Sequence, residues 1–251
     1  MKTASFKKIA RLFLGTTLIA MGSGAFAAST WDFGGCSVAT AGASGCAGSV
    51  AGNNAQAFAW ATTGSGAVFA AATLETSGAG NGFRVHAAGE STTSPQHAMD
   101  NSGAKELIAF HFDTAVALDK IILGWTSSDA DITVMAYTGA GAPTIAGKNV
   151  GNLATGWALI ENSGDVDVGG GSPDSGTDIT RTVNGSNVVS SWWLISAYNS
   201  GYGGGTLDSL SDFVKILSIS SKDVTKVPEP GSLVLLSAGL LGLVAVRRRR
   251  V

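Results

Sequence analysis

The stretch Leu107-Ile108-Ala109-Phe110-His111-Phe112 alternates large apolar side chains with smaller or more polar ones. On an extended backbone Ile108, Phe110 and Phe112 share one face, and Ala109 and His111 share the other. This period of two predicts a half-buried β-strand, with His111 on the less apolar, solvated face.

Similar runs rich in β-branched and aromatic residues recur along the chain, separated by clusters of Gly, Ser, Asn and Asp. They cover residues 120–125, 131–137, 156–160, 188–198 and 213–220. We see no long 3.6-residue periodicity and no helical crossover between these runs. The pattern predicts an all-β body, an antiparallel β-sandwich or jelly roll. The Gly-rich residues 165–178 are expected to form a surface loop.

Charge divides the 251-residue chain into three parts. The first 27 residues carry four basic and no acidic side chains, and the last 25 carry four arginines and one glutamate. Residues 28–226 hold 8 basic and 17 acidic side chains, a net charge of about −9. An acidic body repels phosphate backbones, so we expect no nucleic-acid partner.

The N-terminus has the organisation of a secretory signal peptide over residues 1–27. A basic segment is followed by the apolar residues 12–20 and by Ala25-Phe26-Ala27, a small-x-small site for signal peptidase. The alternative, a first core helix, does not explain the missing polar face. We expect cleavage after Ala27 and export of the body.

Residues 227–251 combine three features in order. Pro228-Glu229-Pro230 precedes an almost uncharged run, residues 231–246, and the chain then carries Arg247, Arg248, Arg249 and Arg250. Sixteen helical residues span about 24 Å, so we expect a single short transmembrane helix whose arginines stay on the cytoplasmic side of the inner membrane.

This tail resembles the PEP-CTERM class of C-terminal sorting signals, which exosortase processes in Gram-negative bacteria. The resemblance implies cleavage near Pro228-Glu229-Pro230 and delivery to the cell surface or extracellular matrix. Such proteins are commonly found in genomes that make extracellular polysaccharide, and we expect this chain to associate with extracellular polysaccharide or biofilm. The prolines agree with this role, because they block helix continuation and leave an extended backbone for a protease.

A second resemblance covers most of residues 31–220, to a family of exosortase-dependent surface proteins of about this size. The residues that carry it are 94–101, 107–112, 122–125, 129–132, 193–199 and 213–217. This resemblance supports the architecture and implies no enzymatic role.

Cys36 and Cys46 are the two cysteines of the chain. Export would expose them to an oxidising compartment, and a disulfide closing this loop would contribute on the order of 2–3 kcal/mol. Two free thiols or part of a metal site are the alternatives, although further Cys or His ligands are lacking nearby.

Catalytic motifs are absent from the sequence: we find no G-x-S-x-G, H-E-x-x-H, Walker A or complete G-x-G-x-x-G pattern. The spacing of His86, His97 and His111 indicates no triad, and Asp100-Asn101 after His97 suggests an Asx turn. Glu75, Glu90, Glu106 and Glu161 are too scattered to indicate a glycosidase pair. We therefore expect no enzyme, and a secreted glycan hydrolase is the least favoured alternative.

Calcium is the one ion that the acidic turns suggest. Asp129 with Asp131, Asp165 with Asp167, and Asp174 with Asp178 offer oxygen ligands, but none completes an EF-hand. We favour Asp129 and Asp131, which open a predicted strand where an ion could tie two sheet ends. Solvated acidic turns are the alternative.

Carbohydrate binding by exposed aromatic rings is a further candidate function. Tyr198 and Tyr202 lie in a Gly-rich loop and are the candidate stacking residues, whereas Trp192 or Trp193, on a strand, is expected in the core. Two functions therefore stay open: a non-enzymatic surface protein associated with polysaccharide, and a calcium-stabilised carbohydrate-binding module.

Overall fold

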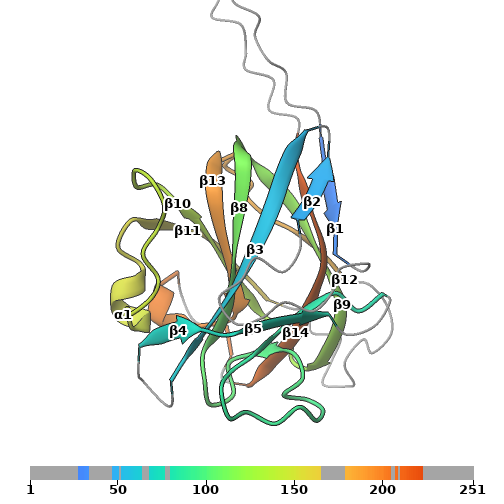
Figure 1. Ribbon diagram of the computed structural model, residues 1–251, viewed down its shortest axis with the longest axis vertical. Coiled ribbons are helices and arrows are strands. Elements are labelled where there is room, and N and C mark those ends of the chain that lie inside the picture. The colour runs from blue at the N-terminus through green and yellow to red at the C-terminus, as the bar shows by residue number, and fades with distance from the viewer. Residues whose placement is uncertain are drawn as a thin grey trace, which may run out of the picture. The chain divides into compact units, whose positions relative to one another are not determined.

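The computed structural model describes residues 28–33, 47–50, 52–63, 68–76, 80–164, 179–204, 207–208 and 210–222. Within these residues two antiparallel β-sheets account for nearly all regular structure, and helix is limited to α1 (Val150–Leu153) and the 3-10 turn η1 (Ser200–Tyr202). The predicted all-β, two-sheet architecture is confirmed (Figure 1). None of the described helices is long and apolar enough to cross a membrane.

The first sheet, sheet A, is built around one long strand, β14 (Asp212–Ser221). Its path runs β12 (Ile179–Thr182), β9 (Leu118–Ser128), β14, β6 (Phe83–His86) and β5 (Thr73–Thr76). Two short strands, β1 (Thr30–Asp32) and β7 (Met99–Asp100), also pair with β14. One long strand therefore holds together segments from both ends of the body.

The second sheet, sheet B, supplies the other layer. Its path runs β11 (Trp157–Ser163), β10 (Ile132–Tyr137), β13 (Ser190–Ala197), β8 (Glu106–Val116), β3 (Asn53–Thr62) and β2 (Ala47–Val50), and β4 (Phe69–Ala71) pairs with β3. The strands predicted from residues 107–112, 120–125, 131–137, 156–160, 188–198 and 213–220 are all present as β8, β9, β10, β11, β13 and β14.

The main core lies between the two sheets. β3 contributes its small side chains to it, because Ala55, Ala57, Ala59 and Ala61 alternate toward the interior. The neighbouring strand β8 contributes the larger Phe110, and β14 of the facing sheet A contributes Ile216. Burial of this apolar surface is the main stabilising contribution to the fold.

A second apolar cluster covers part of the outer face of sheet B. It contains Leu107 and Ala109 of β8 together with Leu153 of α1 and Tyr202 of η1. β8 is therefore buried on both faces over Leu107–Phe110, and our prediction of a half-buried strand is wrong there. The segments that cover this face come from distant parts of the chain, and the period-two pattern of β8 does not reveal that they pack on it.

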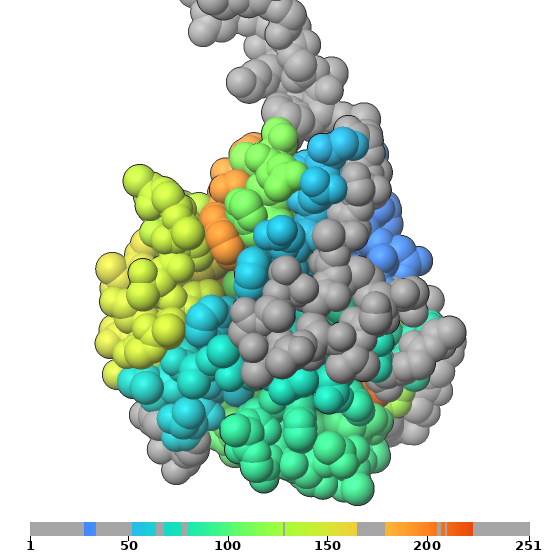
Figure 2. All heavy atoms as spheres, in the orientation of Figure 1, coloured from blue at the N-terminus to red at the C-terminus, as the bar shows by residue number. Residues whose placement is uncertain are grey.

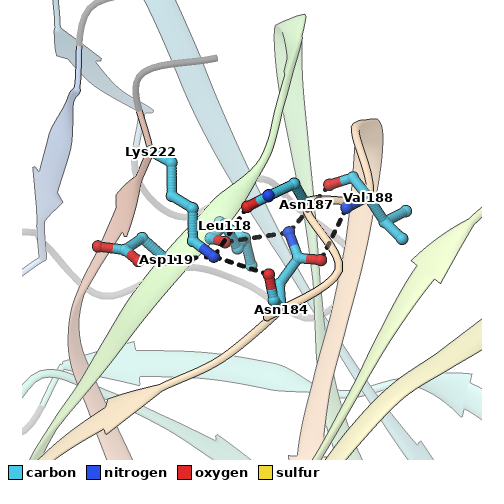
Figure 3. A network of polar contacts seen from close by, with 6 residues as sticks. All are labelled: Leu118, Asp119, Asn184, Asn187, Val188 and Lys222. Atoms are coloured by element: carbon cyan, nitrogen blue, oxygen red, sulfur yellow. Dashed lines mark hydrogen bonds and ion pairs between the residues drawn. The ribbon is translucent and has the colours of Figure 1, made fainter.

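A polar network closes the end of the sandwich where β9 begins (Figure 3). Asn184 has a left-handed backbone (φ 58°), and its side-chain amide donates to the carbonyls of Leu118 at 3.1 Å and Val188 at 2.9 Å. Lys222 donates to the Asn184 carbonyl at 2.7 Å and lies 3.9 Å from an Asp119 carboxylate oxygen. The network thus ties the end of β14 to β9 and to the β12–β13 connection.

Candidate metal centre

Three aspartates meet where the chain passes from sheet A to sheet B. β9 ends at Ser128 and β10 begins at Ile132, so Asp129 and Asp131 lie in the short connection. The Asp129 N–H donates to the Ser127 carbonyl at 2.7 Å, and the Asp129 carbonyl accepts from the Phe213 N–H at 3.1 Å. This backbone pairing places Asp212, the first residue of β14, beside the connection.

Asp212 is fixed by hydrogen bonds on both carboxylate oxygens. Its Oδ1 accepts from the Asp131 N–H at 2.8 Å, and its Oδ2 accepts from the Asn101 side-chain amide at 2.5 Å. Asn101 in turn accepts from the Asp212 N–H at 3.0 Å and donates to the Tyr198 carbonyl at 2.9 Å. The side chain of Asp212 is therefore held in one orientation.

The three carboxylates are buried and close together. Asp129, Asp131 and Asp212 are 3%, 2% and 1% exposed, and one oxygen from each lies within 4.8 Å of the others. Asp129 Oδ1 accepts from the Ala130 N–H at 2.9 Å, whereas its Oδ2 has no hydrogen-bond partner among the described residues. Buried carboxylate oxygens usually have a donor or a cation, so this atom needs an explanation.

Burial raises the pKa values of Asp129 and Asp212 strongly. The pKa of Asp129 is raised to about 7, chiefly by desolvation, then by the charge of Asp131, and then by the hydrogen-bonding contact and charge of Asp208. The pKa of Asp212 is raised to about 8, again by desolvation and by the charges of Asp129 and Asp131. Charged carboxylates in this site therefore destabilise one another unless a cation or protons neutralise them.

Arg181 supplies one positive charge beside the cluster. It is a buried residue of β12, and its Nη2 donates to the carbonyl of Ala130, between the two aspartates, at 3.4 Å. On the other side Asp208, which is exposed, adds a fourth carboxylate close to Asp129. The acids outnumber the base at this site, so the arrangement suits a hard, oxygen-binding cation.

A second group of acids, Glu90, Asp100 and Glu106, also has one oxygen from each within 4.8 Å. Here backbone N–H groups already use most of the oxygens, although Asp100 Oδ2, like Asp129 Oδ2, has no hydrogen-bond partner among the described residues. Glu106 accepts from the N–H groups of Ala87 at 3.0 Å and Asp100 at 2.9 Å, and Glu90 also accepts from Ala87, at 3.1 Å. Desolvation raises the pKa of Glu106 well above its usual value and that of Asp100 to about 7. These carboxylates hold residues 87–100 against β8.

Asp100-Asn101 connects the two acidic groups. Asp100 belongs to the second group and closes the predicted Asx turn, with its Oδ1 accepting from the Ser102 N–H at 2.8 Å. Asn101 reaches the first group through Asp212. The sequence pattern identified the turn but did not indicate that Asn101 supports the aspartate cluster.

Tyr198 and Tyr202 do not form the exposed loop platform that we predicted. Each is only 6% exposed. The Tyr198 hydroxyl accepts from the Leu207 N–H at 3.1 Å, and Tyr202 lies in the second apolar cluster on sheet B. The rings are buried because the loop that carries them folds back on the sheet, so neither offers a face for a sugar.

The two adjacent tryptophans of β13 differ. Trp193 is fully buried in the main core, as predicted, and its indole N–H donates to the Ser190 carbonyl at 3.0 Å. Trp192 points to the opposite face, is only partly buried, and stacks on His111 with ring centroids 4.4 Å apart.

The other two histidines also have structural contacts. His97 packs on the ring of Trp125 at 4.8 Å, and the His86 ring nitrogen Nε2 contacts the Glu90 carbonyl at 3.0 Å.

Several predicted features lie outside the described residues. They are the signal peptide over residues 1–27, Cys36 and Cys46, the acidic loop 165–178, Pro228-Glu229-Pro230, the apolar run and the four terminal arginines. Of the acids near the candidate centre, the sequence indicated Asp129 and Asp131 but missed Asp208 and Asp212. Asp212 is the first residue of β14 and Asp131 directly precedes β10, and this position beside the start of a strand was the one available signal.

Residues 226–250 match the PEP-CTERM protein-sorting motif. No curated protein and no solved structure matches the chain significantly. The chain therefore carries a PEP-CTERM sorting motif over residues 226–250, and this motif implies exosortase-dependent sorting of an exported protein to the cell surface.

Proposed function

We propose that the β-sandwich works at the cell surface without catalysis and associates there with extracellular polysaccharide. The sorting motif gives the destination. The observation that supports the polysaccharide partner is an aromatic row on the outer face of sheet B, formed by Phe58, His111 and Trp192.

The row is built by strand register. Gln56 of β3 pairs with His111 of β8, and His111 pairs with Trp192 of β13. The side chains of Gln56, His111 and Trp192 therefore lie side by side across the sheet. Phe58, two residues along β3, lies 5.6 Å from Trp192 between ring centroids. All four side chains are partly exposed. Figure 2 shows β3, β8 and β13 adjoining one another on the face turned to the viewer.

The chemistry of this face suits a sugar chain. An aromatic ring presents an apolar surface on which the C–H face of a pyranose packs. Beside it Gln56 offers an amide, and the Asn54 amide donates to the exposed Asp113 carboxylate at 2.7 Å. Because residues 28–226 carry a net charge of about −9, we expect neutral rather than acidic glycans to bind.

Binding of the purified protein to neutral polysaccharides, measured by affinity electrophoresis, tests this proposal. Trp192→Ala should weaken binding at least about fivefold, if a sugar ring stacked on the indole contributes roughly the 1–3 kcal/mol that a nucleic-acid base does on an aromatic side chain. Trp125→Ala is the matched control, because Trp125 is also partly buried but belongs to sheet A. Equal loss in both variants, or no binding by the wild type, would contradict the proposal. Turnover of a chromogenic glycoside panel would contradict the non-catalytic role.

A further inference from the structure

We propose that Asp129, Asp131 and Asp212 bind one Ca²⁺ ion, with Asp208 as a solvent-side ligand, and that this ion fastens sheet A to sheet B. The inference goes beyond the proposed surface function and does not depend on polysaccharide binding.

The first argument is the unpaired oxygen. Asp129 is 3% exposed, yet its Oδ2 receives no hydrogen bond from an N–H or hydroxyl donor among the described residues. The Asp208 carboxyl lies within hydrogen-bonding reach of Asp129, but it can donate only when it is protonated. A buried polar atom without a partner costs roughly 1–3 kcal/mol, more when it is charged. Two further buried carboxylates contribute oxygens within 4.8 Å, so the environment supplies acceptors where a donor is missing. A bound cation would coordinate this oxygen and offset the repulsion between the neighbouring carboxylates.

The second argument is the ligand chemistry, which favours Ca²⁺. All candidate ligands are oxygens, and the cluster contains neither His nor Cys. The three buried carboxylates provide three to six oxygens toward the six to eight positions that Ca²⁺ takes. The exposed Asp208, which acts on Asp129, and water can supply the others. Mg²⁺ requires near-ideal octahedral geometry and keeps several waters, which a buried cluster held by backbone hydrogen bonds does not favour.

The third argument is the position in the fold. Asp129 and Asp131 lie where β9 of sheet A continues into β10 of sheet B, and Asp212 begins β14 of sheet A. The carbonyl of Asp131 also accepts from the Tyr198 N–H, just after β13, at 2.9 Å. A bound ion would therefore connect the ends of β9 and β13 with the starts of β10 and β14, which belong to both sheets. Binding to the folded state alone stabilises that state.

Differential scanning calorimetry of the chelator-treated protein, purified after export, tests the proposal. With a dissociation constant of about 0.1–1 mM, as in extracellular calcium modules, 10 mM CaCl₂ should raise Tm by roughly 3–10 °C. The same concentration of MgCl₂ should have a much smaller effect. No Ca²⁺-dependent shift, or an equal response to Mg²⁺, would overturn the calcium assignment.

Asp129→Asn is the decisive variant. The amide oxygen can still accept from the Ala130 N–H, and the amide N–H groups replace Oδ2 and can donate to the neighbouring carboxylates. The calcium-free variant should therefore be at least as stable as the calcium-free wild type. Calcium affinity should fall at least about tenfold, because affinity follows the number of charged ligands. Wild-type affinity in this variant would place the ion elsewhere and overturn the proposal.

Two further variants keep the test independent of folding. Asp208→Asn changes an exposed side chain, and its remaining oxygen can still accept from the Leu210 N–H, so it should weaken Ca²⁺ binding without lowering the calcium-free Tm. Asp119→Asn is the matched control: it lies ten residues before Asp129, about 30 Å away along the extended β9 strand. It should keep the full calcium response; a loss there equal to that of Asp129→Asn would contradict a localised site.

Discussion

The carboxylate of Asp212 accepts a hydrogen bond from the backbone N–H of Asp131 at 2.8 Å, across 81 positions of sequence. This contact joins the start of the long strand β14 to the segment that leaves sheet A for sheet B. A second contact supports it, because Asn101 holds the other Asp212 oxygen and the Tyr198 carbonyl at once. The aspartate cluster is thus part of the joint between the sheets.

Replacing Asn101 by Ala should therefore destabilise the whole sandwich. The Asp212 N–H and the Tyr198 carbonyl would lose their partners, and we expect the free energy of unfolding to fall by about 2–3 kcal/mol. Urea unfolding measures this change. Asn54→Ala, which removes an exposed amide bonded to Asp113, is the control and should cost less than about 1 kcal/mol. Equal effects in the two variants would contradict the role of Asn101.

Asn184 combines a strained backbone with a fully used side chain, so two variants separate these roles. Asn184→Ala removes the bonds to the Leu118 and Val188 carbonyls and keeps a Cβ at φ 58°, so it should cost about 2–3 kcal/mol. Asn184→Gly removes the same bonds but also removes the Cβ from this left-handed position, which offsets about 1 kcal/mol of the cost. Thermal unfolding should rank wild type above Gly and Gly above Ala. An Ala variant as stable as the wild type, which keeps the Cβ and loses only the bonds, would show that the side-chain bonds contribute nothing.

Lys215 should make stability depend on alkaline pH. It is buried, its Nζ lies 4.4 Å from the Trp125 ring centroid, and its neighbours include Arg84 of β6 and His97. Desolvation, and then the charge of Arg84, lower its pKa from 10.5 to about 8. The unfolded chain then binds more protons between pH 8 and 10.5, so stability should rise with pH across this window, by up to about 3 kcal/mol.

Lys215→Met provides the comparison for this pH dependence. Met is unbranched and apolar, so the variant should gain stability at pH 7 and lose the rise between pH 8 and 10.5. Urea titrations at several pH values measure both effects. A variant that keeps the full rise would assign it to other groups.

The sequence predicted the strands well because each is a local pattern. Residues such as Ile108 and Phe110 alternate within one strand, and turn-forming residues bound it. β3 was harder to predict from sequence, because its inner face consists of alanines, which have low β-propensity and bury little area each. Its length is set by pairing with β8, a contact between distant segments.

Only two of the four acids at the candidate metal centre, Asp129 and Asp131, could be predicted from the sequence. Asp129 and Asp131 are two residues apart and visible in the sequence, but Asp212 joins them through the parallel bridge between the backbones of Asp129 and Asp212. Likewise the burial of Tyr202 depends on packing in the second apolar cluster with Leu153 of α1, which loop composition does not reveal. The position of Asp212 and the burial of Tyr202 both depend on contacts between distant segments, which the local sequence pattern does not reveal.

Mass spectrometry of the intact protein from the cell-surface fraction tests the central claim, that this chain is exported and processed through its PEP-CTERM tail. The mature protein should begin near Ala28 and end near Pro228-Glu229-Pro230, with the four terminal arginines removed. A surface protein that keeps Met1, or one that still carries Arg247 to Arg250, would contradict the account.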